Sequence, residues 1–357
     1  MQDHTFYMAR CLQLAQMGKG ATAPNPMVGA VLVHDGRVIG EGYHRQYGMA
    51  HAEVACLESV PPVDKQLIPQ STMYVSLEPC AHKGKTPSCA LRLVDEQVKE
   101  VVVCNPDPFH LVQGRGFEIL REHNIVTSSG LLDASGIWLN RRFFCFHQQQ
   151  RPYVALKWAQ TRSGFFAPLN RTRYQMSNRH GQQLVHRWRS EEAAILVGTN
   201  TALHDDPQLT ARLWSGHHPL RLVIDKDLSL PSSLRVFNVE APTWVFNSIR
   251  DSVAGNISYK KLDFSGSIIP QILSALYAHN ILSVMVEGGA HLLNSFIQEG
   301  LWDEARIFST PDMLSEGIAA PMLSNAMHAF ATELGTDNLN VYVHSHSAYP
   351  YVNGMEL

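Results

Sequence analysis

Three side chains that suit a zinc ion, and one carboxylate beside them, lie in the first third of the sequence. His51 offers an imidazole, and Cys80 and Cys89 offer thiolates, which are ligands that zinc prefers. Because three ligands leave the fourth tetrahedral position open, this set indicates a catalytic zinc rather than a closed structural one. Glu53 follows His51 by two residues, where its carboxylate can exchange protons with a water molecule that the metal activates. The pattern therefore predicts a zinc-dependent hydrolytic centre with Glu53 as its general acid and base.

The order His-x-Glu, then Pro-Cys, then Cys is typical of the zinc deaminases. The spacing is unusual among them, because eight residues separate Cys80 from Cys89, whereas nucleoside and nucleic-acid deaminases usually have about two. The segments 24–30 (PNPMVGA) and 76–89 (SLEPCAHKGKTPSC) resemble the deaminase half of the bifunctional deaminase/reductase of riboflavin biosynthesis. This resemblance implies hydrolytic removal of the 2-amino group from a diaminopyrimidinone that carries a phosphoribosylamino substituent.

The resemblance also implies polar contacts for that substrate, from Asn25, His44, Lys85 and Asp107. Asn25 lies between two prolines that restrict its backbone, which suits an amide that reads the edge of a pyrimidine ring. Lys85 belongs to the insertion between the cysteines, and we expect it to meet a phosphate. After Asp107 the family often has Pro-Asn-Pro, so Phe109 is expected to change one pocket contact. For each of the four, the alternative is a solvated loop residue.

Two turns that each lead from a strand into a helix characterise the second half. They contain Gly198 and the pair Gly288–Gly289, and they present backbone N–H groups that suit an anion, although plain turn chemistry is the alternative. The sequence lacks the Gly-x-Gly-x-x-Gly fingerprint, so a Rossmann fold is not indicated. Motifs from Lys157 to Gly289 follow the order of the riboflavin-pathway reductase domain. That domain is similar to dihydrofolate reductase and uses NADPH.

The resemblance implies residues for both ligands of this reductase. The implied cofactor contacts are Gln160, Gln175, Thr201, Asp205 and Gly289. The implied substrate contacts are Lys157, Arg173, Arg189, Leu209, Arg212 and Glu287. Arg189, Arg212 and Glu287 would hold the ribose phosphate and hydroxyls, since a guanidinium can donate two parallel hydrogen bonds to a phosphate. The family reaction delivers hydride to the sugar C1 and converts the ribosyl group to a ribityl chain.

The second half departs from the family pattern at two positions. The usual Ser-x-Asp-Gly segment reads Thr-Arg-Ser-Gly at 161–164, so Ser163 replaces the carboxylate. The usual Trp-Ile-Thr segment reads Gln-Met-Ser at 175–177, so Gln175 replaces the aromatic residue. Two hypotheses therefore stay open, namely a bifunctional enzyme and a deaminase whose second half is catalytically impaired.

Composition and charge bear on the other classes of protein that the zinc motif allows. With 357 residues, 45% of them hydrophobic and 17% charged, the chain is long enough for two globular domains. A net charge of −3 without a basic block argues against a nucleic-acid deaminase. A non-enzymatic, zinc-stabilised binding protein remains an alternative. The sequence shows neither a signal-peptide pattern nor an apolar run of about 20 residues, so we expect a cytoplasmic homo-oligomer without a membrane partner.

Strands and helices are expected to alternate along the chain. In the first half we expect a helix at 4–17, hairpin strands at 30–33 and 37–39, a helix carrying His51 and Glu53, strands at 72–77 and 101–104, and helices beginning at Thr86 and Phe117. In the second half we expect strands at 152–156, 193–197, 220–225, 243–246, 282–287 and 305–308. The predicted fold class is α/β, with a cytidine-deaminase-like three-layer domain at 1–147 and a dihydrofolate-reductase-like domain at 151–357.

Overall fold

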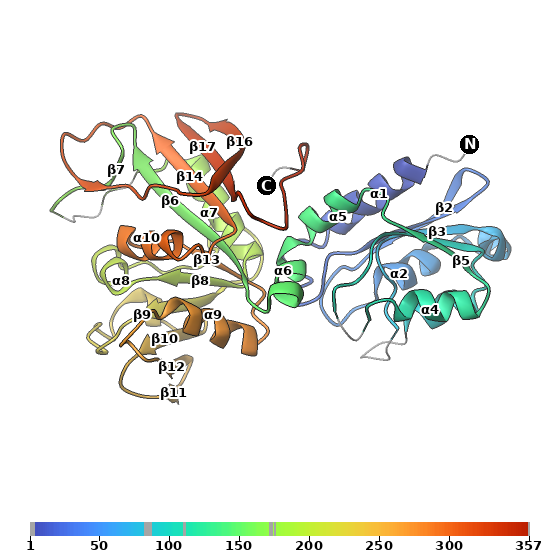
Figure 1. Cartoon of the computed structure of the whole chain (residues 1–357), viewed down its shortest axis with the longest axis horizontal. Coiled ribbons are helices and arrows are strands. Elements are labelled where there is room, and N and C mark those ends of the chain that lie inside the picture. Colours follow the sequence, from blue (N-terminus) through green and yellow to red (C-terminus); the bar gives the residue numbers. More distant parts are fainter. Residues whose placement is uncertain (1–3, 82–87, 110–111, 171–173, 175, 356–357) are drawn as a thin grey trace. The chain divides into compact units, whose positions relative to one another are not determined.

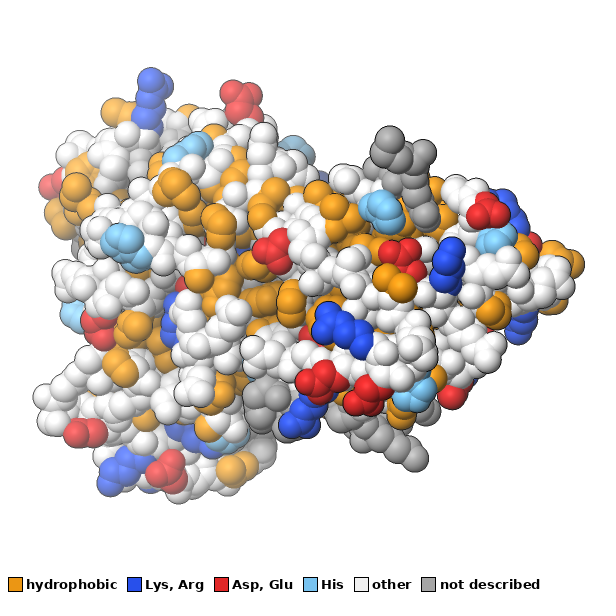
Figure 2. All heavy atoms as spheres, turned by 45° about the vertical axis from the view of Figure 1, so that its right-hand side comes forward, with side chains coloured by type: hydrophobic (Ala, Val, Ile, Leu, Met, Phe, Trp, Pro, Cys, Tyr) orange, Lys and Arg blue, Asp and Glu red, His pale blue; other side chains and the backbone are white. Residues whose placement is uncertain are grey.

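The computed structural model describes residues 4–81, 88–109, 112–170, 174 and 176–355. Within it the chain forms two compact units that divide between Gln149 and Gln150, each with its own sheet and core (Figure 1). On the face shown in Figure 2, acidic and basic side chains are interspersed, in keeping with the small net charge of −3. No helix in these described stretches is both long enough and apolar enough to cross a membrane.

A five-stranded sheet forms the middle of the first unit. Its strands are β1 (Gly29–His34), β2 (Arg37–Tyr43), β3 (Thr72–Leu77), β4 (Glu100–Asn105) and β5 (Val126–Ser129). They lie in the order β2-β1-β3-β4-β5, with β1 antiparallel to both neighbours and the last three parallel. The predicted hairpin is confirmed, because Asp35 and Gly36 have φ angles of 46° and 79°, as a two-residue hairpin turn requires.

Helices on both faces of this sheet make the first unit a three-layer α/β structure, as predicted (Figure 1). They are α1 (His4–Gln16), α2 (Ala52–Ser59), the 3₁₀ helix η1 (Pro62–Gln70), α3 (Cys89–Asp95), α4 (Arg115–Glu122), α5 (Asp133–Leu139) and α6 (Arg141–Gln149). Helices α1 and α5 pack on one face, and α2, α3 and α4 contribute apolar side chains to a core on the other. Because both faces are covered, every residue of the central strand β3 is buried.

The start of helix α3 differs from the prediction. Its N-cap is Ser88, whose hydroxyl accepts a hydrogen bond from the Leu91 N–H at 3.3 Å. The predicted cap, Thr86, lies outside the described residues. Cys89 is the first helical residue, so its predicted place in the first turn is confirmed.

A ten-stranded sheet organises the second unit, beside a small two-stranded one. The strands are β6 (Tyr153–Thr161), β7 (Phe165–Ala167), β8 (Ala194–Val197), β9 (Leu220–Ile224), β10 (Thr243–Asn247), β11 (Ser252–Ala254), β12 (Ile257–Lys261), β13 (Ser283–Val286), β14 (Glu304–Thr310), β15 (Ile318–Ala319), β16 (Ala326–Leu334) and β17 (Asp337–His344). The large sheet has the order β11-β12-β10-β9-β8-β13-β6-β14-β17-β16, and its seven strands from β12 to β14 are parallel. The six predicted strands are β6, β8, β9, β10, β13 and β14, and β6 continues beyond its predicted end to Thr161.

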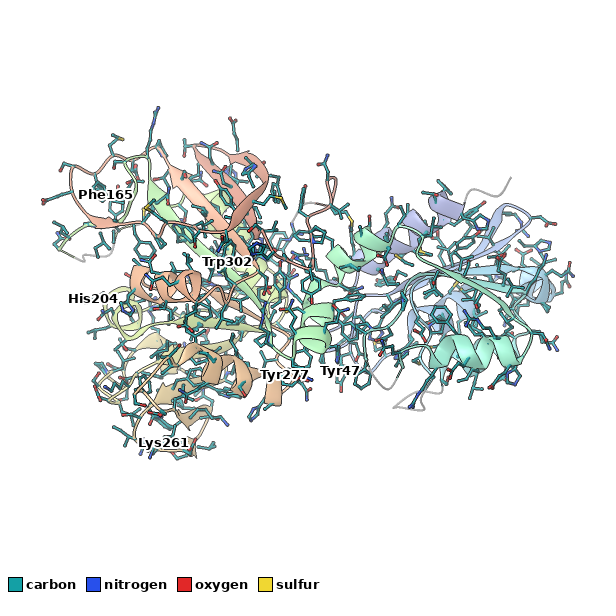
Figure 3. All side chains as sticks on the ribbon, viewed as in Figure 1. Tyr47, Phe165, His204, Lys261, Tyr277 and Trp302 are labelled. Atoms are coloured by element: carbon teal, nitrogen blue, oxygen red, sulfur yellow. The ribbon has the colours of Figure 1, made fainter. Side chains whose placement is uncertain are left out.

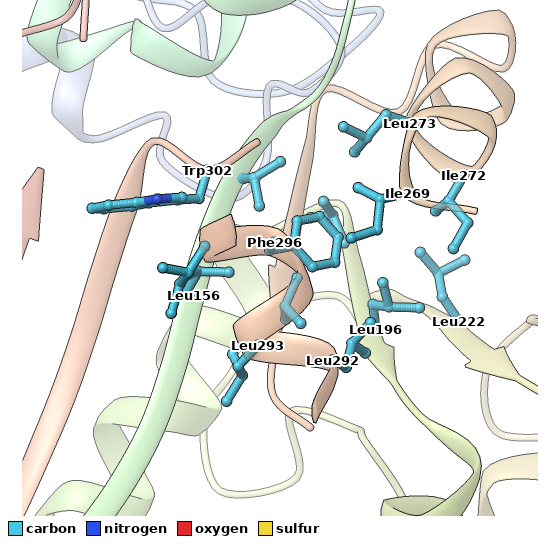
Figure 4. Packing of buried hydrophobic residues seen from close by; sticks show 14 of the residues in the cluster. Leu156, Leu196, Leu222, Ile269, Ile272, Leu273, Leu292, Leu293, Phe296 and Trp302 are labelled. Atoms are coloured by element: carbon cyan, nitrogen blue, oxygen red, sulfur yellow. The ribbon is translucent and has the colours of Figure 1, made fainter. Parts of the chain in front are cut away.

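Helices also cover both faces of the large sheet. They are α7 (Arg179–Glu191), α8 (Thr199–Asp205), the 3₁₀ helix η2 (Arg235–Phe237), α9 (Ile269–Ala278) and α10 (Ala290–Gln298). Figure 4 shows the core beneath α9 and α10, where Ile269 and Phe296 pack with strand residues such as Leu196. Helix α7 covers the opposite face, because its Trp188 ring lies 5.6 Å from that of Phe308, which points away from this core on β14.

Candidate active sites

His51, Cys80 and Cys89 come together in the first unit from three separate elements. His51 is the N-cap of α2, Cys80 follows β3 after two residues, and Cys89 begins α3. The Nδ1 atom of His51 lies 3.6 Å from Cys80 Sγ and 3.3 Å from Cys89 Sγ, and all three ligand atoms lie within 4.8 Å of one another. Tetrahedral zinc with bonds of about 2.0 Å to nitrogen and about 2.3 Å to sulfur spaces its ligand atoms about 3.6 Å apart. The donor set and its spacing therefore fit zinc.

Charge around the two sulfurs also suits a cation. The pKa of Cys80 is lowered chiefly by a hydrogen bond from the Cys89 thiol, and burial opposes this effect. The contact of Cys80 with His51 and the Cys89 backbone N–H, 3.3 Å from the sulfur, lower the pKa further. The pKa of Cys89 is raised, because its thiol donates a hydrogen bond to Cys80 and is buried beside the negative charge of the Cys80 thiolate. Without a cation, ionisation of one cysteine therefore opposes ionisation of the other. A metal ion that both sulfurs ligate would remove this opposition.

Glu53 is the second residue of α2 and is only 3% exposed. Burial raises its pKa to about 7, with the charge of Cys80 adding to the effect and His51 opposing it. The carboxyl group also shares a hydrogen bond with the thiol of Cys89. It thus lies beside the cysteine ligands and can take up or release a proton near neutral pH, which is what a general acid and base needs.

Asn25 and His44 form a hydrogen-bonded pair next to the metal ligands. The His44 ring lies 5.3 Å from the His51 ring, and its Nδ1 lies 3.0 Å from the Ala50 carbonyl oxygen. Burial lowers the pKa of His44, so the ring is neutral and Nδ1 must carry the proton that it donates to Ala50. Its Nε2 then accepts from the Asn25 amide nitrogen at 3.2 Å. This arrangement leaves the Asn25 side-chain oxygen to accept a hydrogen bond from a ligand.

Asp107 follows β4 and is 7% exposed. Burial raises its pKa to about 7, the Phe109 backbone N–H at 2.8 Å opposes this, and the charges of Glu78 and Cys80 add to it. Sequence analysis assigned no role to Glu78, which is buried and accepts the Asp107 backbone N–H at 3.1 Å. Lys85, the fourth predicted substrate contact, lies outside the described residues.

The ring of Phe109 packs against helix α6. Its centroid lies 5.0 Å from that of His147, and the His147 ring in turn lies 4.5 Å from Phe143. The residue that departs from the family pattern beside Asp107 thus fastens the loop after β4 to the last helix of the unit.

In the second unit, two adjoining cavities collect most of the predicted reductase residues. The first has a volume of about 250 Å³, and seven predicted residues line it: Lys157, Arg189, Thr201, Asp205, Leu209, Arg212 and Glu287. The second has a volume of about 370 Å³ and is lined by Gly289 and by four of the same residues, Lys157, Thr201, Asp205 and Glu287. His204, labelled on α8 in Figure 3, also lines the second cavity. The parallel strands β8 and β13 bring Thr201 and Glu287 together, because both residues follow the carboxyl ends of these strands at one edge of the sheet. Lys157 comes from the neighbouring strand β6, and Arg189 comes from helix α7.

One described residue of the predicted set lies outside both cavities. Gln160 lines neither of them, and its side-chain oxygen accepts the Trp158 indole N–H at 2.9 Å. Arg173 and Gln175 lie outside the described residues.

Arg189 and Glu287 form a two-pronged ion pair at the wall of the first cavity. The Nε and Nη2 atoms of Arg189 lie 2.7 Å from the two carboxylate oxygens, and Nη1 lies 3.4 Å from the Thr210 carbonyl oxygen. Burial raises the pKa of Glu287, but Arg189 and Lys157 lower it more, to about 2. Burial lowers the pKa of Lys157, while Glu287 opposes that change. Arg189 therefore holds Glu287 ionised beside Lys157.

His186 is a cavity residue that sequence analysis missed. It lies on α7, one turn before Arg189, is 4% exposed and lines the first cavity. Burial lowers its pKa to about 4, and the charges of Arg189 and Arg212 add to this. Among the described residues, its Nδ1 has no hydrogen-bond partner. The helical spacing of His186 and Arg189 is the signal that sequence analysis had for finding it.

Ser163 lies in the turn between β6 and β7 and lines neither cavity. Its hydroxyl lies 3.0 Å from that of Thr161 and accepts the Leu314 backbone N–H at 3.0 Å. The departure from the family pattern at this position therefore lies in a turn where the Ser163 hydroxyl is already engaged with Thr161 and Leu314.

Comparison with known proteins matches both units to one family. The family model of the cytidine and deoxycytidylate deaminase zinc-binding region matches residues 1–105, and that of the RibD C-terminal domain matches residues 152–326. The riboflavin biosynthesis protein RibD of Aquifex aeolicus is 38% identical over 318 residues, 88% of each chain. That of Escherichia coli is 33% identical over 332 residues, 88% of this chain and 89% of the other.

Solved structures agree with this result. RibD of Acinetobacter baumannii is 31% identical, with a TM-score of 0.87 over 95% of this chain and 98% of the other. A Thermotoga maritima protein described as a diaminohydroxyphosphoribosylaminopyrimidine deaminase/5-amino-6-(5-phosphoribosylamino)uracil reductase is 31% identical, with a TM-score of 0.87 over 96% of this chain and 98% of that one.

The chain belongs to the RibD family of riboflavin-biosynthesis enzymes, and both its zinc-deaminase region and its reductase domain are present. The predicted fold class is thereby confirmed for both halves.

Proposed function

We propose that this chain carries out two consecutive steps on one phosphorylated substrate. The first unit would deaminate 2,5-diamino-6-(5-phosphoribosylamino)pyrimidin-4-one, and the second would reduce the ribosyl group of the product to ribityl with NADPH. The convergence of His51, Cys80 and Cys89 beside the buried Glu53 carries the first half of the proposal. The description of the Thermotoga maritima relative as a deaminase and reductase of these compounds supports both substrates.

In the deamination, His51, Cys80 and Cys89 would hold zinc, which when bound activates a water molecule for attack on the carbon that bears the amino group. Glu53 takes a proton from that water, passes one to the ring nitrogen and protonates the departing ammonia. The side-chain oxygen of Asn25 accepts a hydrogen bond from the pyrimidine, and His44 fixes the direction of that amide. The carbon–nitrogen bond breaks, water supplies the carbonyl oxygen, and ammonia leaves.

In the reduction, the second cavity suits NADPH, because Gly289 lines it and precedes helix α10, whose first backbone N–H groups suit a phosphate. Bound NADPH supplies a hydride. We assign Lys157 and Glu287 to the sugar hydroxyls, with Arg189 orienting Glu287. Arg212 lines the same cavity and suits the ribose phosphate, because a guanidinium can donate two parallel hydrogen bonds to a phosphate.

The decisive experiment supplies the diaminopyrimidinone phosphate with and without NADPH. We expect one ammonia per substrate under both conditions, and loss of the nicotinamide absorbance band only when both compounds are present. Absence of ammonia release by zinc-loaded protein would refute the deaminase assignment. Metal analysis of the same sample should give one zinc per chain.

The second candidate function is a deaminase with an impaired reductase unit, which the replacements at Ser163 and Gln175 motivate. It predicts ammonia release without NADPH oxidation when the deaminated intermediate is supplied. The hydrogen bonds that Ser163 makes in its turn weigh against this candidate. We further propose that residues 1–147 and 151–357 are the two functional domains, and that the chain forms a homo-oligomer, which sedimentation would test.

A further inference from the structure

Glu78 is a buried carboxylate in the zinc motif that none of the proposed chemistry uses. It lies between the end of β3 and Cys80, and it is 3% exposed. Its two oxygens accept hydrogen bonds from three backbone N–H groups. Oε2 accepts from Asp107 at 3.1 Å and from Gly114 at 3.2 Å, and Oε1 accepts from Gly116 at 3.0 Å.

Two of these donors belong to the start of helix α4. Gly114 is its N-cap and has no side chain to cap the helix, while Gly116 is its second residue. The first N–H groups of a helix have no partner within it, and the positive end of the helix dipole favours a negative charge there. Glu78 therefore caps α4 from a different element.

The same helix start is pressed against the peptide that leads to Cys80. A Cβ atom at Gly116 would lie 2.2 Å from the Pro79 carbonyl oxygen and 3.1 Å from Glu78 Oε1, so only glycine fits. The third donor, the backbone of Asp107, lies at the start of the loop after β4. One carboxylate thus ties together the Cys80 peptide, the Asp107 loop and α4.

We propose that Glu78 is a positioning residue of the deaminase site, which holds Asp107 in a fixed place relative to the zinc ligand Cys80. It acts through the backbone of Asp107 and does not touch the substrate. The proposal rests on the proposed deaminase function, in which Asp107 contacts the pyrimidine substrate. Loosening this tie should weaken substrate binding more than it slows the chemistry at the metal.

The test is Glu78→Gln in the full-length, zinc-loaded enzyme. Glutamine keeps one acceptor oxygen, but its NH2 group must face a backbone N–H, so at least one buried donor loses its partner. We expect faster amide hydrogen exchange at Asp107, Gly114 and Gly116, one zinc per chain as in the wild type, and kcat/KM for ammonia release lower by about tenfold to a hundredfold, mainly through KM. Glu100→Gln is the matched control, because it removes a carboxylate on β4 that accepts a hydrogen bond from the Thr72 hydroxyl at 3.1 Å and from no other side chain in the described part of the chain.

Unchanged hydrogen exchange at the three amides would show that Glu78 does not hold the loop and helix in place. Faster exchange with an unchanged KM would show that Glu78 holds them but does not position Asp107 for the substrate. A loss confined to kcat with zinc missing would show that Glu78 serves the metal ligands instead. If Glu78→Gln does not fold, Gly116→Ala decides, because its methyl group pushes α4 away from Pro79 and should raise KM in the same way. A wild-type enzyme without deaminase activity would refute the proposed function, whereas the exchange measurement would still decide whether Glu78 anchors the loop.

Discussion

The two units build their sites in different ways. In the first, three ligands and a carboxylate lie between residues 51 and 89, and a strand end and two helix starts hold them in place. In the second, the residues of the first cavity run from Lys157 to Glu287, and an ion pair joins positions 189 and 287. Chemistry in the first unit therefore depends on a few residue types, while in the second it depends on a shape that distant elements create together.

The largest effect that this contrast predicts follows from replacing the proton carrier. Glu53→Gln should lower kcat for ammonia release by about 10²- to 10⁴-fold, because a glutamine amide cannot shuttle protons. Zinc content and NADPH oxidation with the deaminated intermediate should match the wild type, since Glu53 belongs to the first unit. Full deaminase activity in Glu53→Gln would favour a zinc-stabilised binding role for this unit.

The ion pair of the second unit should behave as a structural element as well as a functional one. Arg189→Met leaves the Glu287 carboxylate buried without its partner and should lower the free energy of unfolding by about 3–5 kcal/mol. The double variant Arg189→Met/Glu287→Met should be less destabilised than the single one, because the buried carboxylate is removed together with its main partner and only the Lys157 amine loses an opposite charge. Chemical denaturation of the three proteins measures this, and equal losses in both variants would contradict the ion-pair argument.

A smaller effect should appear in the dependence of stability on pH. His186 has a folded pKa of about 4 against 6.5 in its ordinary state, so the unfolded chain takes up a proton there first. Its contribution to stability is complete above pH 6.5 and is lost as the pH falls toward 4. Between pH 7.5 and pH 5, the free energy of unfolding should fall less in His186→Gln than in the wild type. Urea denaturation midpoints at the two pH values measure this difference.

The exposed His180 on the same helix is the matched control for this experiment. His180→Gln should retain the wild-type dependence on pH. If both variants lose the same stability on acidification as the wild type, the environment assigned to His186 is wrong.

The smallest effect is expected at Ser163. Ser163→Asp restores the residue type that is usual in the family, but in a turn that lines neither cavity. Reductase kcat should therefore stay within about twofold of the wild type, a range that assumes a change in the turn does not reach the cavities. A large gain in NADPH oxidation would instead support the candidate with an impaired reductase.

Sequence analysis predicted best where local signals decide the structure. The Asp35–Gly36 turn, the strand at 72–77 and the place of Cys89 in the first turn of α3 each follow from residues next to one another. The proposed zinc ligands were identified for the same reason, because their residue types and order are themselves the signal, and the structure brings their ligand atoms within 4.8 Å of one another. Helices α5 and α6 were missed, since they have only seven and nine residues and α5 contains Gly136.

Roles that depend on distant contacts could not be predicted from the chain alone. Glu78 meets donors 29 to 38 positions away, and these contacts exist only after β3, β4 and α4 have assembled. The hairpin β16–β17 was missed because β16 is largely exposed and lacks an alternating apolar pattern. Arg189 was expected to hold a phosphate, and only the folded structure brings it against the carboxylate of Glu287.

The contact between the rings of Phe109 and His147 bears on where the enzyme can be divided. A fragment ending at residue 147 would make His147 a frayed terminal residue with a new carboxylate, and the ring beneath the Asp107 loop would lose its support. A cut after Gln149, where helix α6 ends, keeps that ring inside an intact last turn. Dissection of the two activities should therefore preserve deamination in the longer fragment and weaken it in the shorter one.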